Sequence, residues 1–135
     1  MPALRPTIFP YKIVAGRWSP TISVGIRLQS AWLPVGLYVD SGAAYTILRA
    51  RVAKDAGFSY THGRKIFVQV GDGGVIPVWL HELPIQIGNR QFTAPIGFSD
   101  KLGVPFNLLG RLGVFENFRI CFHEKRRVVS FQPTN

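Results

Sequence analysis

Cysteine is scarce in this chain, and long apolar runs are missing. The single cysteine, Cys121, excludes an internal disulfide, and its position between Ile120 and Phe122 predicts a small strand residue. No run reaches the ~18 apolar residues that span a bilayer. Residues 1–6 lack the continuous apolar stretch of a secretory signal. We therefore expect a cytoplasmic protein without a membrane span.

Acidic residues are also few. Seven Asp and Glu residues stand against sixteen Lys and Arg residues, which gives a formal net charge of +9. Such a charge attracts nucleic acids and acidic surfaces. The cations are spread along the chain, however, and their one run, 125–127, is flanked by Phe122 and Val128 as a hairpin turn would be. We expect no specific nucleic-acid partner, and a small basic β-barrel that binds nucleic acid is kept as an alternative.

Most of the sequence has the pattern of short strands bounded by glycine and proline, of which there are fourteen and ten. The predicted strands cover 20–28, 33–39, 65–70, 75–83, 84–92 with a Gly-Asn turn, 119–122 and 128–131. Two short helices are predicted, over 48–56 with a stop at Gly57 and over 111–118. A chain of 135 residues that is 47% hydrophobic is long enough for one core. We expect a single all-β domain over residues 1–135.

One carboxylate, Asp40, follows the apolar run 35–39 and precedes another apolar run. Removing an acid from water is costly unless hydrogen bonds, a partner charge or a proton compensate, so Asp40 calls for a chemical reason. Ser41 supplies a hydroxyl, and Gly42 lets its backbone amide approach the carboxylate closely. The segment predicts a strand that ends at a functional acid.

The sequence Asp40-Ser41-Gly42-Ala43 resembles the active-site turn of the aspartic proteases. Two further segments resemble the retropepsin-like, single-domain branch of that family. These are the Gly-rich hairpin turn Gly71-Asp72-Gly73-Gly74-Val75-Ile76 and the hydrophobic-hydrophobic-Gly element Leu108-Leu109-Gly110-Arg111. The resemblance covers roughly residues 18–132 and is closer to cellular and bacterial members than to viral ones.

The resemblance implies a small closed or partly open β-barrel of the acid-protease type with one or two short helices. It implies an N-terminal extension over 1–17 and a flap hairpin over 66–83 that carries the Gly-rich turn. Asp40 would be the catalytic acid, with Ser41, Gly42 and Ala43 supporting it. The chain holds one such turn, so a second copy would supply the second carboxylate of the dyad in a homodimer that cleaves peptides.

One position departs from the viral pattern. The acid that usually follows the turn and pairs with the arginine of the hydrophobic-hydrophobic-Gly element is replaced by Ala44. Arg111 is then expected to bond backbone carbonyls, reach Glu116 or meet another chain. The histidines His62, His81 and His123 lack the spacing of a metal site, so we expect no metal. The implied mechanism uses water as the nucleophile and needs no cofactor. A catalytically inactive module of the same fold, used for peptide binding or dimerisation, is the main alternative function.

Overall fold

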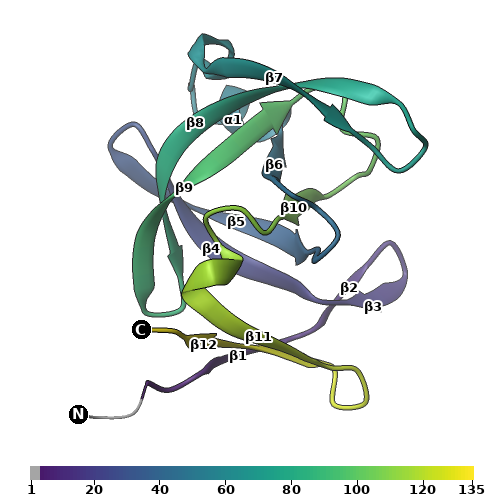
Figure 1. The fold of residues 1–135 in the computed structure, drawn as a ribbon, viewed down its shortest axis with the longest axis vertical. Helices are drawn as coiled ribbons and strands as arrows, with labels where there is room; N and C mark the ends of the chain where they lie inside the picture. The colour runs from purple at the N-terminus through teal and green to yellow at the C-terminus, as the bar shows by residue number, and fades with distance from the viewer. Residues whose placement is uncertain (1–3) are drawn as a thin grey trace.

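In the computed structural model, which describes residues 4–135, seven strands form one strongly twisted sheet (Figure 1). Their order is β4-β5-β10-β6-β9-β8-β7, and β4 also pairs with β8 through Gly25 with Gln86 and Ile26 with Ile85. The additional pairing closes the sheet into a ring, which confirms the predicted all-β barrel. The strands are β4 (Thr21–Leu28), β5 (Ala31–Val39), β6 (Thr46–Arg49), β7 (Arg64–Gln69), β8 (Val75–Ile87), β9 (Arg90–Ser99) and β10 (Asn107–Leu109).

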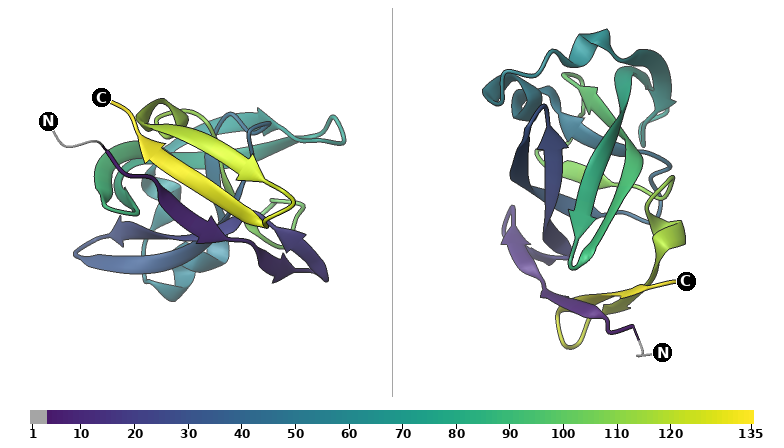
Figure 2. Two further views of the ribbon diagram at one scale, coloured as in Figure 1. Left: turned by 90° about the horizontal axis from the view of Figure 1, so that it is seen from below. Right: turned by 90° about the vertical axis from the view of Figure 1, so that its left-hand side faces the viewer.

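The two ends of the chain meet in a smaller sheet below the barrel (Figure 2). Strand β12 (Val128–Pro133) lies between β1 (Thr7–Pro10) and β11 (Phe118–His123), which confirms the predicted terminal hairpin. Strands β2 (Lys12–Val14) and β3 (Arg17–Ser19) form a separate hairpin. Within the expected extension 1–17, residues 7–10 are therefore part of the terminal sheet, and residues 1–3 lie outside the described residues.

The barrel strands form because their apolar residues alternate. Along β4, Ile22, Val24, Ile26 and Leu28 point inward and are almost fully buried, while Ser23 and Arg27 face outward. Burying such a side chain contributes about 1.5–3 kcal/mol. The main core extends from these residues to Phe98 on β9 and Phe131 on β12, so the barrel and the terminal sheet share one apolar interior.

A second apolar cluster lies under the β7–β8 hairpin. Its buried members are Ile47 on β6 and Ile76, Val78 and Leu80 on β8. Tyr45, Ile66, Val68, Val70 and Leu102 pack around them. This cluster joins the hairpin to the segment that follows Asp40.

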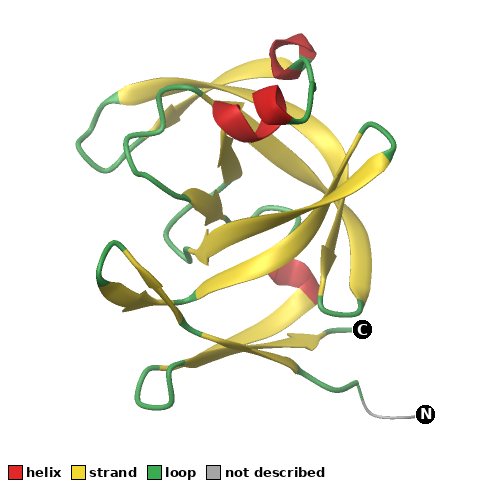
Figure 3. Ribbon diagram, turned by 180° about the vertical axis from the view of Figure 1, so that it is seen from behind, coloured by secondary structure: helices red, strands yellow, loops and turns green. Residues whose placement is uncertain are grey.

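The helices are shorter than predicted (Figure 3). Helix α1 covers Ala50–Asp55, because Leu48 and Arg49 pair with β9 as the end of β6. Its predicted stop is correct, since Gly57 has a φ of +69°. The predicted helix over 111–118 is wrong: only the 3₁₀ turn η2 (Phe115–Asn117) forms, because Gly113 has a φ of +74° and Phe118 already belongs to β11. A further 3₁₀ turn, η1, covers Tyr60–His62.

Strand β8 runs through Pro84, where the sequence predicted a new strand. Along β8, the pairing with β7 stops at Leu80, and the pairing with β4 begins at Ile85. Pro84 therefore lies where β8 has β9 as its neighbour but neither β7 nor β4, so the missing N–H disturbs little. The predicted turn at Gly88-Asn89 is confirmed, with Gly88 at a φ of +60°. None of the helices within residues 4–135 has both the length and the apolar character needed to cross a membrane.

Candidate active site

Asp40 lies at the end of β5, where the strand leaves the barrel. Its backbone N–H donates a hydrogen bond to the carbonyl oxygen of Leu109 on β10 at 3.0 Å. Its carboxylate is half-buried and accepts a hydrogen bond from the amide of Gly42 at 2.9 Å through Oδ1. A Cβ at Gly42 would lie 3.2 Å from the same oxygen, so glycine suits this close approach. The turn thus holds the carboxylate in a fixed orientation.

The other residues of the turn contribute through their backbone. The amide of Ala43 donates to the carbonyl oxygen of Asp40 at 3.1 Å and closes the turn. Ser41 is exposed, and its hydroxyl forms no hydrogen bond within the described part of the chain. The hydroxyl is therefore available for a hydrogen bond to a group on another molecule.

The hydrophobic-hydrophobic-Gly element passes directly behind the turn. Strand β10 lies between β5 and β6, parallel to β5 with Leu109 opposite Val39, and antiparallel to β6 with Leu108 opposite Ile47. A Cβ at Gly110 would clash with the backbone carbonyl of Tyr45. The sequence segments 40–45 and 108–111, far apart in the chain, are thus brought together.

Thr46 was missed by the sequence analysis. Its side chain is fully buried, and its Oγ1 accepts a hydrogen bond from the amide of Gly110 at 3.0 Å. The bond fastens the glycine to the strand that follows the active-site turn. A hydroxyl inside the apolar run 45–48 was the available signal, since a buried polar group needs a partner.

Arg111 follows Gly110 and lies beside the turn. Its backbone amide donates to the carbonyl oxygen of Ala43 at 3.0 Å, and the amide of Leu112 donates to that of Ala44 at 2.8 Å. The guanidinium is exposed and forms no ion pair within residues 4–135. The expected contact with Glu116 is absent there. The Oε1 atom of Glu116 accepts a hydrogen bond from the amide of Gly113 at 2.9 Å.

The Gly-rich turn closes the hairpin of β7 and β8 and projects from the barrel (Figure 1). The amide of Val70 donates to the carbonyl oxygen of Gly74 at 2.8 Å, and Asp72 accepts a bond from the amide of Gly74 at 2.7 Å. Gly73 has a φ of +85°, which favours glycine. Residues 71–75 are exposed, whereas Ile76 is buried in the cluster under the hairpin.

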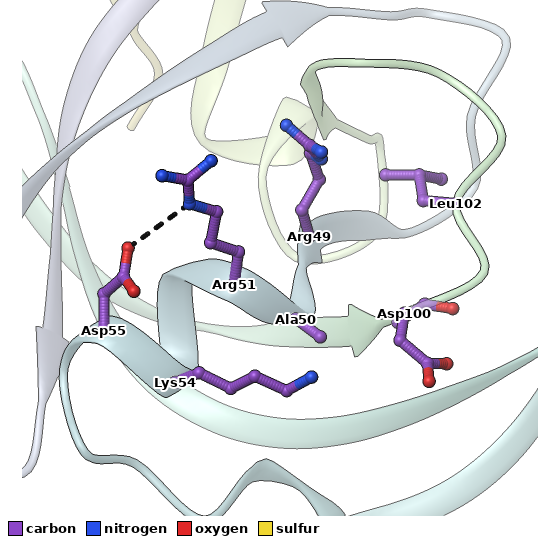
Figure 4. A pocket seen from close by; sticks show the side chains of 8 residues that line it. Arg49, Ala50, Arg51, Lys54, Asp55, Asp100 and Leu102 are labelled. Carbon is purple, nitrogen blue, oxygen red and sulfur yellow. Dashed lines mark ion pairs between the residues drawn. The ribbon is translucent and has the colours of Figure 1, made fainter.

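A pocket of about 380 Å³ lies away from Asp40, where β6 and α1 meet the segment after β9 (Figure 4). Arg49, Arg51 and Lys54 line it together with Asp55 and Asp100. Arg51 Nε lies 3.6 Å from Asp55 Oδ2, and both side chains are largely exposed, so the pair contributes little. The basic side chains of the pocket are partly balanced by its two acidic ones. Asp40 is not among the lining residues.

Metal ligands do not gather in the described residues. Within residues 4–135, no group of three or more His, Cys, Asp or Glu side chains is arranged to hold a metal ion. His81 bonds the carbonyl oxygen of Tyr60 and packs against Phe58 and Phe98, which is a structural role.

Two solved structures are similar to this chain. One is a retropepsin-like aspartic protease from Rickettsia conorii, with a TM-score of 0.67 and 16% identity over 94% of this chain and 98% of that chain. The other is EIAV protease in complex with the inhibitor HBY-793, with a TM-score of 0.50 and 22% identity over 73% of this chain and 86% of that chain. No protein-family model and no curated protein sequence matches the chain.

The protein therefore has a retropepsin-like fold, as the sequence motifs predicted. Its similarity to the bacterial structure is greater in both TM-score and coverage than its similarity to the viral one. At these identities the likeness establishes the fold. The activity therefore has to be argued from the residues of the site.

Proposed function

We propose that the protein is a homodimeric aspartic endopeptidase in which Asp40 of each copy supplies one carboxylate of the catalytic dyad. The observation that carries this proposal is the Asp40 turn, whose carboxylate is held by the amide of Gly42 and whose backbone is fixed by Leu109. The turn has the sequence Asp-Ser-Gly, and the chain that carries it has a retropepsin-like fold. Residues 1–135 would act as one domain.

The chemistry needs two carboxylates that share one proton. Like charges a few ångströms apart cannot both ionise, so one carboxylate is neutral while the other is charged. The charged carboxylate takes a proton from water, and the resulting nucleophile attacks the carbonyl carbon of the scissile bond. The neutral one donates its proton to the carbonyl oxygen, and proton transfer to the amide nitrogen then releases the amine. A two-fold axis near Asp40 makes the two groups equivalent until substrate binds.

The β7–β8 hairpin would act as the flap over the substrate. Glycines at 71, 73 and 74 leave the tip free of large side chains, and the cluster of Ile76, Val78 and Leu80 anchors its base. An extended peptide would pair with the backbone of this hairpin, and closure would exclude bulk water from the dyad. Peptides or proteins are then the substrates, and the mechanism uses water alone as its co-reactant.

The test is cleavage of a diverse peptide mixture by the purified protein at several pH values, read by mass spectrometry. We expect cleavage by the wild-type protein and a loss of about 10²- to 10⁴-fold with Asp40→Asn, while circular dichroism and the urea midpoint stay within error of wild type. Asp100→Asn, which changes an exposed aspartate outside the turn, is the matched control and should cleave normally.

The alternatives give different results. Cleavage that persists in Asp40→Asn contradicts the assignment of the acid. A folded wild-type protein that binds peptides without cleaving them identifies the inactive module. Binding to nucleic acid that weakens steeply with salt and is unchanged in Asp40→Asn indicates the basic-barrel alternative. The expected cytoplasmic location is a separate part of the proposal, which cell fractionation tests.

A further inference from the structure

Arg111 places an exposed cation beside the Asp40 turn. Two backbone hydrogen bonds, from Arg111 to Ala43 and from Leu112 to Ala44, align residues 111–112 with residues 43–44. Ala43 is only three residues from Asp40. A peptide extended across the carboxylate advances about 3.3 Å per residue, so its side chains a few residues from the scissile bond would pass the segment that carries Arg111.

The acids of the chain leave the charge of Arg111 unbalanced. Within residues 4–135, the one ion pair joins Arg51 to Asp55. Asp72 accepts a hydrogen bond from Gly74, Glu116 from Gly113 and Glu124 from Tyr11. Asp40, Glu82 and Asp100 form no ion pair within residues 4–135. Ala44, next to the turn, offers no carboxylate.

A guanidinium in this position can bind a carboxylate on another molecule. Arginine presents a planar fork that matches a carboxylate with two parallel hydrogen bonds. In the single chain it is exposed and therefore solvated, so it needs no partner for folding. The net charge of +9 also raises the local concentration of acidic peptides around the molecule.

We infer that Arg111 selects substrates with Asp or Glu about two to three residues from the scissile bond; this inference rests on the proposed function and names its substrate class. In the proposed homodimer each copy contributes one Arg111, so the preference extends to both sides of the bond. Arg111 is thus a specificity residue, while Asp40 performs the chemistry.

The experiment uses a peptide that the wild-type protein cleaves, made in versions with Glu, Gln or Lys at each position up to three residues from the bond. The wild-type protein should favour Glu over Gln by about two- to fivefold in kcat/KM at low salt, and the ratio should fall as salt rises. Arg111→Gln should bring the ratio to about one, and Arg111→Glu should favour Lys. Arg27→Gln, an exposed arginine paired with Trp32 at the far end of β5, should keep the wild-type ratio.

Two results would overturn the inference. One is an unchanged preference for Glu in Arg111→Gln. The other is an equal loss of kcat/KM in Arg111→Gln for all versions of the peptide, together with a weaker dimer in sedimentation. Arg111 would then support the subunit contact.

A binding assay separates this inference from the proposed function. Fluorescence anisotropy of labelled Glu and Gln peptides is measured with Asp40→Asn and with Asp40→Asn/Arg111→Gln. If the wild-type protein cleaves nothing but Arg111 still gives tighter binding of Glu peptides, the proteolytic function fails and the preference for acidic peptides stands. If the wild-type protein cleaves and neither assay distinguishes Glu from Gln, the proteolytic function stands and the preference for acidic peptides fails.

Discussion

At the scale of single residues, Gly110 is the position where the fold leaves least freedom. Any Cβ there would meet the backbone of Tyr45, and backbone atoms cannot move aside as a flexible side chain can. We predict that Gly110→Ala lowers the free energy of unfolding by about 3 kcal/mol, measured by urea denaturation. Gly103→Ala is the matched control, because a Cβ there has nothing within 4 Å and should change stability by less than about 0.5 kcal/mol. Equal stability of the two variants would contradict the close approach at Gly110.

Tyr11 gives a prediction about high pH. Burial, together with the hydrogen bond of 2.8 Å to Glu124 and the charge of that carboxylate, raises the pKa of Tyr11 from 10.0 to about 12. A group whose pKa is higher in the folded state stabilises the fold fully below its unfolded pKa and loses that contribution as pH rises. The difference in free energy of unfolding between wild type and Tyr11→Phe should therefore be constant up to about pH 10 and shrink towards pH 12. A difference that stays constant across this range would show that the phenol is not perturbed.

At the scale of elements, a matched pair of glycines tests whether the hairpin of β7 and β8 acts as a flap or is an ordinary hairpin turn. Gly73 and Gly16 have φ values of +85° and +77°, and a Cβ at either would have nothing within 4 Å. Alanine at each should cost about 1 kcal/mol of backbone strain. If the hairpin is the flap, Gly73→Ala lowers kcat/KM several-fold, while Gly16→Ala, at the tip of the β2–β3 hairpin, leaves it unchanged. Equal kinetics for both variants would remove the hairpin from the mechanism.

The elements that the sequence predicts well are those defined by local patterns. Hairpins are predicted correctly at 70–75, at Gly88-Asn89 and at the C-terminus, because turn residues and alternation are both local. Residues 48–49 are helix formers by propensity, yet they belong to β6 because β9 offers a partner strand. Tertiary pairing outweighs propensity there, and no local signal reveals it.

At the scale of the whole molecule, closure of the barrel depends on contacts between distant residues. The pairing of β4 with β8 joins Gly25 to Gln86, and the terminal sheet joins Thr7 to Phe131. The resemblance of three short motifs implied a barrel, but alternation alone does not say which strands are neighbours. The same holds for Asp40, whose turn was evident in the sequence, whereas its contact with Leu109 required the fold.

The dyad itself belongs to this scale, since one chain supplies one Asp40 turn, and a mixing experiment tests it. In a homodimer, a wild-type subunit paired with an Asp40→Asn subunit lacks one of the two carboxylates and should be inactive. Random exchange of subunits then reduces the activity per wild-type subunit to about half at equal amounts and to about a quarter at a threefold excess of the variant. Asp100→Asn, which keeps its Asp40, should not inhibit. A site complete within one chain would instead give activity that depends only on the amount of wild-type protein, whatever the excess of variant.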